Sequence, residues 1–221
     1  MNIPQLNKYT LEFPHPSEST NEGIVAWGGD LNPSRLIKAY QSGIFPWSMP
    51  HEPLLWWSPD PRLIMELDDF KLRKSLKKKL PRFTYKFNTQ FNDVMRMCAL
   101  TPRSDQEGTW ISQDLIESFE VLHGMGLAHS VETYLDGKLV GGLYGLSIGG
   151  VFCGESMFSL VSDASKAAYS VLVQRLKELE YDFIDCQIPT KHLKSLGAKE
   201  ISRDEFLVRL EKSKYKDPKS F

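Results

Sequence analysis

One glycine-rich stretch constrains the fold more than any other part of this 221-residue chain. It runs from Leu139 to Ile188 and begins LVGGLYGLSIGGVFCGESMFS. Six glycines fall within fourteen positions, at 141, 142, 145, 149, 150 and 154, and apolar residues stand between them. Glycine inside a strand lets another group approach the backbone closely. The pattern therefore predicts strands that pack tightly against another element or a ligand.

Two turn signals divide this region into a meander. Asp136-Gly137 is a strong two-residue hairpin signal, and Gly149-Gly150 indicates a second hairpin. We therefore predict strands at 128–135, 138–147 and 150–157.

A helix and a further strand follow the meander. The helix is predicted over 164–180, with Ser162 or Asp163 as its N-cap. Its inward face is formed by Ala164, Ala167, Ala168, Val171, Leu172, Leu176 and Leu179. The strand at 181–188 carries Asp185 and Gln187, whose side chains are predicted to share a face because strand residues alternate.

The order of these elements resembles the core of the GNAT acyltransferases. After the strand, Thr190 caps a short helix that ends at Gly197. In a GNAT core, the acyl donor binds where two strands splay apart beside the helix. The Gln/Arg-x-x-Gly-x-Gly/Ala loop that binds pyrophosphate in that family is absent, since FSLVSDASK stands there. We therefore expect an acyl donor other than coenzyme A.

Composition excludes several other classes of protein. The chain is 41% hydrophobic with a net charge of −1, so any contact with nucleic acid needs a local patch. The cysteines, Cys98, Cys153 and Cys186, are odd in number and scattered, which argues against disulfides or zinc and favours a cytoplasmic location. Neither a signal peptide nor an apolar run of about 18 residues is evident, so no membrane association is expected.

Residues 1–61 are predicted to form a small N-terminal domain. They hold nine of the thirteen prolines and four of the five tryptophans. One helix is clear, with Asn32 as its N-cap, Pro33 in its first turn and Gly43 as its stop. Trp56 and Trp57 are interpreted as a small core, whereas Trp47 could line a cleft toward the larger domain at 62–221.

Residues 62–87 carry a local net charge of +6. The basic residues are a solvated helix face or a patch for phosphate groups, and these residues alone leave both interpretations open.

Further helices are predicted after this basic segment. Asn88 caps the first, Leu100–Gly108 forms a mobile loop, and Ser112 caps the second helix. Trp110 precedes that helix and either packs beneath it or serves as a stacking platform. The segment 199–210 supplies a closing strand and short helix, followed by a basic, frayed tail.

Nine stretches together resemble the leucyl/phenylalanyl-tRNA–protein transferases. They are WGGDLNPSRLIKAYQSGIFPW, LLWWSPDPR, EGTWI, GLAHSVE, LVGGLYG, FCGESMFS, ASKAA, FIDCQ and HLKSLGA. The resemblance implies an α+β fold with a small N-terminal domain and a GNAT-like domain whose mixed sheet is mainly antiparallel. It also implies transfer of Leu, Phe or, less often, Met from aminoacyl-tRNA to proteins with N-terminal Arg or Lys, which marks them for N-degron proteolysis.

The resemblance implies three catalytic residues. Asp185 and Gln187 match the family's D-C-Q motif, in which Gln187 would accept a hydrogen bond from the attacking amine and Asp185 would orient it and favour proton loss. Glu155 in GESMFS resembles the acidic residue near the cationic acceptor. The competing hypothesis is that the 2′-OH of the tRNA carries the proton. From the residues alone, the D-C-Q pair could also be a hydrogen-bonded strand end.

The resemblance also implies the substrate contacts. The donor side-chain pocket would be walled by Leu143, Phe152, Met157, Leu172 and Ile184. The family often has Met at position 143 and Phe at position 172, so the ranking of Leu and Phe as donors stays open. Trp47 and Trp110 match tryptophans that hold the 3′-terminal adenosine. The acceptor-stem patch would be Arg73, Lys74, Lys77, Lys78, Lys79 and Arg82.

Two alternative functions remain at this stage, an acyl-coenzyme A acetyltransferase and a non-catalytic tRNA-binding module. The five histidines lack metal-ligand spacing, so neither a metal nor another cofactor is expected. We expect a monomer.

Overall fold

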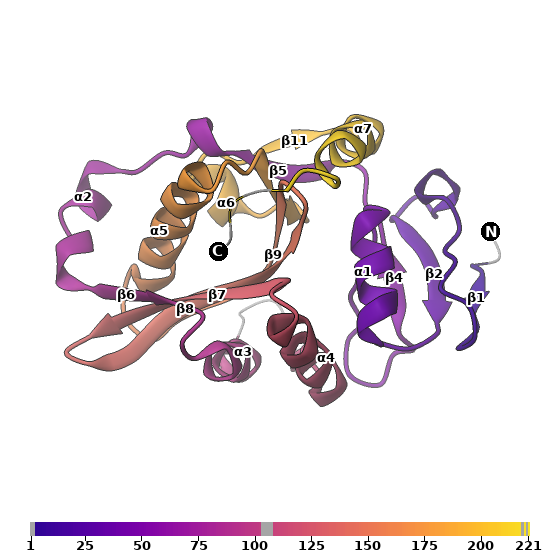
Figure 1. Ribbon diagram of the computed structural model, residues 1–221, viewed down its shortest axis with the longest axis horizontal. Helices are drawn as coiled ribbons and strands as arrows, with labels where there is room; N and C mark the ends of the chain where they lie inside the picture. The colour runs from indigo at the N-terminus through magenta and orange to yellow at the C-terminus, as the bar shows by residue number, and fades with distance from the viewer. Residues whose placement is uncertain (1–2, 103–107, 218, 220) are drawn as a thin grey trace.

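The computed structural model describes residues 3–102, 108–217, 219 and 221. Two sheets lie side by side, a four-stranded sheet of order β1-β2-β4-β3 and a seven-stranded sheet of order β11-β5-β10-β9-β8-β7-β6 (Figure 1). In the larger sheet only β9 and β10 pair in parallel. The predicted α+β class, with a mixed and mainly antiparallel sheet, is confirmed.

The N-terminal sheet is built from short strands, as its proline content predicts. Its elements are β1 (Gln5–Leu6), β2 (Ile24–Gly28), α1 (Pro33–Gln41), β3 (Phe45–Pro46) and β4 (Leu55–Trp57). The Asn32 side chain accepts a hydrogen bond from the Ser34 amide, which confirms the predicted cap. Trp56 is fully buried and its indole N–H donates to the Gly28 carbonyl at 2.9 Å. Its burial is as predicted, but it belongs to a hydrophobic cluster that both sheets share and not to a separate small core.

The glycine-rich stretch forms the predicted meander of β7 (Ala128–Leu135), β8 (Lys138–Ile148) and β9 (Val151–Ser159). Both predicted hairpin turns are present, and Gly149 adopts a positive φ of 54°. A Cβ added to Gly141 would lie 2.6 Å from the Cβ of Ala164. Glycine is therefore required here because the start of the following helix packs directly on the strand.

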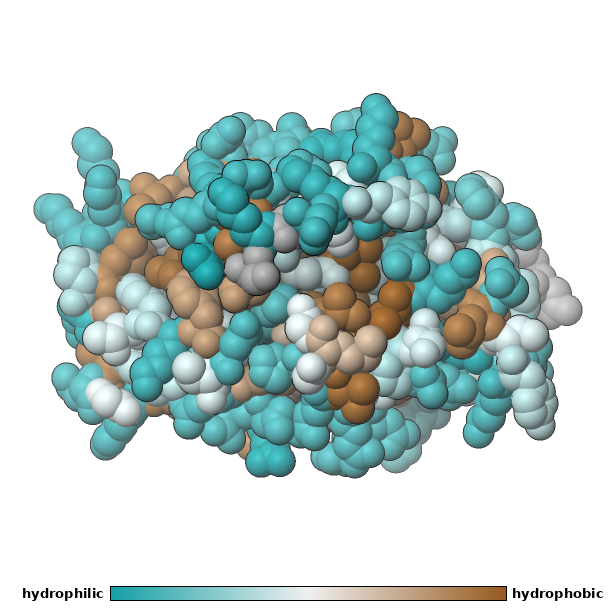
Figure 2. Space-filling view, viewed as in Figure 1, coloured by the Kyte–Doolittle hydropathy of each residue, from teal (hydrophilic) through white to brown (hydrophobic). Residues whose placement is uncertain are grey.

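Helices cover both faces of the larger sheet (Figure 1). The helix α5 (Ala164–Glu178) packs on β7, β8 and β9 on one face, while α3 (Phe91–Leu100) and α4 (Gln113–Gly124) lie on the other. The other elements are β5 (Arg62–Glu66), α2 (Lys74–Lys77), β6 (Thr84–Phe87), β10 (Phe183–Gln187), α6 (Lys191–Ser195), β11 (Lys199–Ile201) and α7 (Arg203–Ser213). Apolar side chains reach the surface near the middle of the molecule among hydrophilic ones (Figure 2).

One predicted helix cap is wrong, and a second lacks its expected hydrogen bond. Asn88 lies two residues before the N-cap of α3, Gln90, and its side chain accepts from the Ser130 amide instead. The amides of Thr89 and Gln90 donate to the buried Glu132 carboxylate of β7, which replaces a local cap. Asp163 is the N-cap residue of α5, as predicted, but its side chain makes no capping hydrogen bond, and its carboxylate pairs with Lys79 and Lys166. Of the predicted Leu100–Gly108 loop, residues 103–107 lie outside the described part of the chain.

The two sheets share one hydrophobic cluster, which includes Trp56 and Tyr40 from the N-terminal part and Phe158 and Phe206 from the larger part. The predicted domain boundary between residues 61 and 62 stays a prediction. Across the described residues, no helix combines the length and apolar character needed to cross a membrane.

Candidate active site

A cavity opens where two parallel strands separate. β9 and β10 pair only from Val151 to Cys153 and from Phe183 to Asp185. Beyond this point β9 stays with β8 as far as Ser159, whereas β10 ends at Gln187. The cavity between the separated ends has a volume of about 440 Å³ and is lined mainly by apolar side chains. Its size is typical of a small-molecule site.

Nine of the ten residues predicted for catalysis and substrate binding line this cavity. They are Trp47, Trp110, Leu143, Phe152, Glu155, Met157, Leu172, Ile184 and Gln187. They come from the larger sheet, from α5, from the position directly after β3 and from the loop before α4. The exception is Asp185, which lies beside the cavity and not in its lining.

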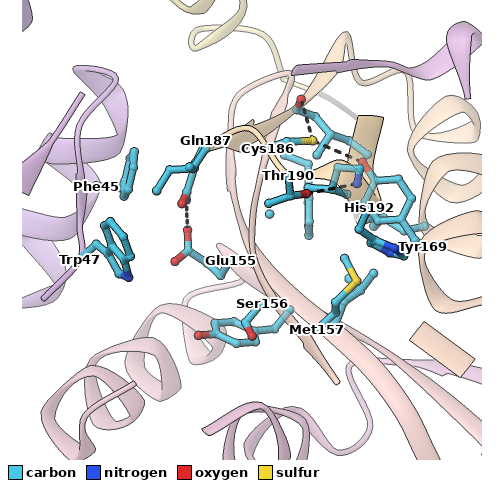
Figure 3. A pocket seen from close by; sticks show the side chains of 18 of the residues that line it. Phe45, Trp47, Glu155, Ser156, Met157, Tyr169, Cys186, Gln187, Thr190 and His192 are labelled. Carbon is cyan, nitrogen blue, oxygen red and sulfur yellow. Dashed lines mark hydrogen bonds between the residues drawn. The ribbon is translucent and has the colours of Figure 1, made fainter. Parts of the chain in front are cut away.

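The lining residues are ordered along the cavity (Figure 3). Phe45 and Trp47 stand at one end, Tyr169, His192 and Met157 at the other, and Glu155 and Gln187 lie between them. Sequence reasoning missed Phe45, Tyr169 and His192. Tyr169 lies on the buried side of α5 and His192 in the HLKSLGA stretch, but neither position has a local pattern that indicates a cavity.

Gln187 takes an unusual backbone conformation that directs its side chain into the cavity. Its φ is +62°, in the left-handed region, and the pairing of β10 with β5 shifts register between Asp185 and Gln187. Asp185 is opposite Ile64 and Gln187 is opposite Leu63, so the two side chains lie on opposite faces. The prediction that they share a face is wrong because a bulge interrupts the alternation. The side-chain amide nitrogen of Gln187, Nε2, donates to Glu155 Oε1 at 2.7 Å.

Asp185 is held by Arg62, which sequence reasoning counted only as part of the basic segment. Arg62 donates from Nε and Nη2 to the two carboxylate oxygens at 2.8 and 2.7 Å, and both side chains are 1% exposed. The guanidinium also lies over the rings of Phe45 and Phe206. The backbone N–H of Gln187 donates to Asp185 Oδ1 at 2.9 Å. The buried ion pair with Arg62 therefore holds Asp185 in place, and Asp185 in turn fixes the backbone of Gln187 through this hydrogen bond.

Glu155 has a strongly perturbed acidity. Burial raises the pKa of its carboxyl to about 7, although the nearby Tyr40 hydroxyl and the hydrogen bond from Gln187 act in the opposite direction. Tyr40 belongs to α1, so the N-terminal part of the chain contributes to this environment. A carboxyl group with a pKa near 7 exchanges protons readily at neutral pH.

Most of the predicted basic patch is solvent-exposed on and around α2. Arg73, Lys74, Lys77, Lys78 and Arg82 are exposed, whereas Lys79 is held 2.5 Å from Asp163. In Figure 1, α2 lies on the far side of α5 from the N-terminal sheet. Among the residues that the structure describes, no group of three or more His, Cys, Asp or Glu side chains is arranged to hold a metal ion.

An apolar cavity between separating strands, flanked by an amide, a carboxyl group and aromatic rings, suits a protein that transfers an acyl group. Residues 64–211 match the profile described as leucyl/phenylalanyl-tRNA protein transferase, and residues 29–60 match its N-terminal domain. The chain belongs to the leucyl/phenylalanyl-tRNA protein transferase family, as the sequence motifs predict.

Curated relatives carry the same family name. The chain is 64% identical to a leucyl/phenylalanyl-tRNA–protein transferase of Sulfurimonas denitrificans over 95% of its own length and 92% of the relative. It is 50% identical to that of Syntrophotalea carbinolica over 91% of its length and 88% of the relative.

Solved structures with a similar arrangement are more distant. L-PGS from Bacillus licheniformis is 13% identical with a TM-score of 0.44, over 77% of this chain and 56% of that one. A GCN5-related N-acetyltransferase from Kribbella flavida is 13% identical with a TM-score of 0.36, over 75% of this chain and 59% of that one. This chain therefore spans a little over half the length of these solved chains.

Proposed function

We propose that this aminoacyltransferase moves Leu, Phe or, less often, Met from aminoacyl-tRNA to the N-terminal Arg or Lys of acceptor proteins. The family names the two donors, and the order of groups along the cavity supports them. An aminoacyl-tRNA end has the sequence adenosine, ester, side chain. The cavity has the rings of Phe45 and Trp47 at one end, Glu155 and Gln187 in the middle, and Met157 together with Tyr169 and His192 at the other end. This correspondence is the observation that carries the proposal.

The donor side chain would lie against Met157, Leu172 and Ile184. An apolar cavity distinguishes substrates by only about 1–3 kcal/mol per methylene group, so it accepts several large apolar amino acids. Trp47 and Trp110 would hold the terminal adenosine by stacking, which is worth about 1–3 kcal/mol per base. The tRNA acceptor stem would then reach the exposed basic residues around α2.

The acceptor would approach from the side of Glu155. A carboxylate there attracts the positive charge of an N-terminal Arg or Lys. Transfer to such residues would mark the acceptor for N-degron proteolysis in the cytoplasm, with the enzyme acting as a monomer.

The reaction needs alignment and proton removal more than activation of the donor, since the aminoacyl ester is already reactive. The attacking α-amine has a pKa of about 8 and is mostly protonated at neutral pH. With its amide nitrogen committed to Glu155, Gln187 has its carbonyl oxygen available to accept a hydrogen bond from the amine. Asp185 would serve as a positioning residue that holds Gln187 in place.

Radiolabelled Leu-tRNA tests this function. We expect transfer to a protein with N-terminal Arg and none to the same protein with N-terminal Ala. Leu172→Trp should fill the cavity and abolish transfer, while Val208→Ala, at an exposed position on α7, should leave it unchanged. Transfer of an acetyl group from acetyl-coenzyme A would instead favour an ordinary acetyltransferase. Binding of tRNA without any transfer would favour a non-catalytic module.

A further inference from the structure

Two carboxyl groups lie close to the point where the amine would attack, and they differ in access. Glu155 lines the cavity and contacts Gln187, whereas Asp185 lies outside the lining and is 1% exposed. A proton acceptor must come within hydrogen-bond reach of the proton it removes. Of these two carboxyl groups, Glu155 alone meets this condition.

The carboxylate oxygens of Asp185 are also already occupied by hydrogen bonds within the protein. Both carboxylate oxygens of Asp185 accept hydrogen bonds from the Arg62 guanidinium, and Oδ1 also accepts one from the backbone N–H of Gln187. Arg62 and Asp185 form an ion pair at 2.7 Å in which both side chains are 1% exposed, so the Asp185 carboxylate serves a structural contact and does not face the substrate.

We propose that Glu155 is the catalytic residue that takes the proton from the acceptor's α-ammonium group, with Asp185 acting only to position Gln187. This inference rests on the proposed aminoacyl transfer and assigns the proton step within it. Gln187 joins the two functions, because its side chain contacts Glu155 and its backbone contacts Asp185.

The ammonium nitrogen loses two protons in the reaction. The Glu155 carboxylate takes the first, and the freed electron pair forms the C–N bond to the ester carbonyl carbon. The bond between that carbon and the ribose 3′-oxygen then breaks. The second proton moves from the nitrogen to this oxygen, which leaves as a hydroxyl group, and Glu155 releases the first proton to water.

The groups around Glu155 adjust its proton affinity to this task. Tyr40 faces it from α1, Gln187 and Asp185 from β10, Arg62 from β5, and Cys153 lies on its own strand. Burial and the nearby Asp185 charge raise the pKa of Glu155 to about 7, while Tyr40, Gln187 and Arg62 lower it. This value lies close to the pKa of about 8 of an α-ammonium group, so the proton passes between them at little cost.

The pH dependence of Glu155→Gln tests the proposal. At saturating Arg-peptide, we expect kcat for the variant to fall about tenfold to hundredfold at pH 7. The defect should shrink toward pH 9, because the amine then loses its proton to water. With hydroxylamine, which is uncharged at neutral pH, the variant and the wild type should react at similar rates.

Asp185→Asn is the comparison variant. If Asp185 only positions Gln187, Asp185→Asn should lower kcat by a similar factor at every pH, and by the same factor with hydroxylamine as the acceptor. Affinity for Leu-tRNA, measured by filter binding, should be retained in Glu155→Gln, which shows that the variant is folded.

Three results would overturn the assignment. They are an unchanged kcat in Glu155→Gln with only a higher KM for the Arg-peptide, a constant defect at all pH values, or a pH-dependent defect in Asp185→Asn alone. Failure of the wild type to transfer Leu to any acceptor would instead overturn the proposed function, and this inference with it.

Discussion

Glu155 couples the chemistry of the site to the stability of the fold. The ordinary pKa of a glutamate carboxyl is about 4.5, and in the folded chain burial raises that of Glu155 to about 7. Folding therefore favours the protonated form. Below about pH 4.5 the group is protonated in both states, and its contribution is fully retained. As the pH rises from 4.5 to 7, the unfolded chain loses this proton first, and the contribution is lost.

The free energy of unfolding should therefore fall in this window relative to a variant that cannot titrate. Between pH 4.5 and pH 7, we expect the free energy of unfolding of Glu155→Gln to rise relative to that of the wild type by up to about 3 kcal/mol. Urea unfolding at several pH values measures the difference. Glu12→Gln, at an exposed carboxyl, is the matched control and should show a much smaller change. A constant difference between Glu155→Gln and the wild type would contradict the raised pKa.

At the scale of the element, β10 combines a parallel edge, an antiparallel edge and a bulge within five residues. The bulge separates Asp185 from Gln187 and places them on opposite faces. It depends on the left-handed conformation of Gln187, which glutamine adopts at some cost.

Glycine at position 187 should relieve that cost. Gln187→Gly and Gln187→Ala both remove the contact with Glu155, so a comparison between them isolates the backbone. We expect Gln187→Gly to be more stable than Gln187→Ala by about 1 kcal/mol, although both lose activity. At Thr84, in the extended strand β6, we expect the opposite result, with Thr84→Ala more stable than Thr84→Gly. Equal stabilities at position 187 would argue against backbone strain there.

At the scale of the whole molecule, the cavity opens between β9 and β10, whereas the exposed basic residues lie on and around α2. In Figure 1, α2 lies on the far side of α5 from the N-terminal sheet. A tRNA that places its 3′ end in the cavity can use these residues only through its acceptor stem. Variants of the basic residues should therefore affect tRNA binding without affecting the chemistry in the cavity.

The double variant Lys74→Ala and Lys77→Ala should weaken tRNA binding in proportion to the number of phosphate groups that the two lysines neutralise. The slope of log K against log salt concentration should become shallower by about 0.7–0.9 for each such phosphate. Transfer from a short aminoacyl-adenosine, which has no stem, should stay unchanged. Lys212→Ala on α7 serves as the control. An unchanged slope in the double variant would place the tRNA elsewhere.

The shared hydrophobic cluster should make the two sheets unfold together. Leu36 on α1 is fully buried in it, and truncation to Ala should cost about 2–5 kcal/mol. Tryptophan fluorescence reports mainly on residues 1–61, which hold four of the five tryptophans, while far-UV circular dichroism reports on the whole chain. Both transitions should shift equally in Leu36→Ala. Separate transitions would show that the parts unfold independently.

Local signals predicted much of this architecture correctly. The Asp136-Gly137 and Gly149-Gly150 turns, and the caps at Asn32, Ser112 and Thr190, are all present. Each depends on contacts between residues a few positions apart. The Asn88 cap failed because Glu132, more than forty residues away, satisfies the helix N-terminus.

The sequence by itself determined the family, the order of elements from the meander at 128–157 to the short helix before Gly197, and nine residues that line the cavity. Only the tertiary structure decided how the three polar residues of the site divide their roles. The buried pair of Asp185 with Arg62 joins residues 123 positions apart, and the bulge that turns Gln187 toward Glu155 depends on how β10 pairs with β5. Strand register and burial are set by long-range packing, which a local pattern does not contain.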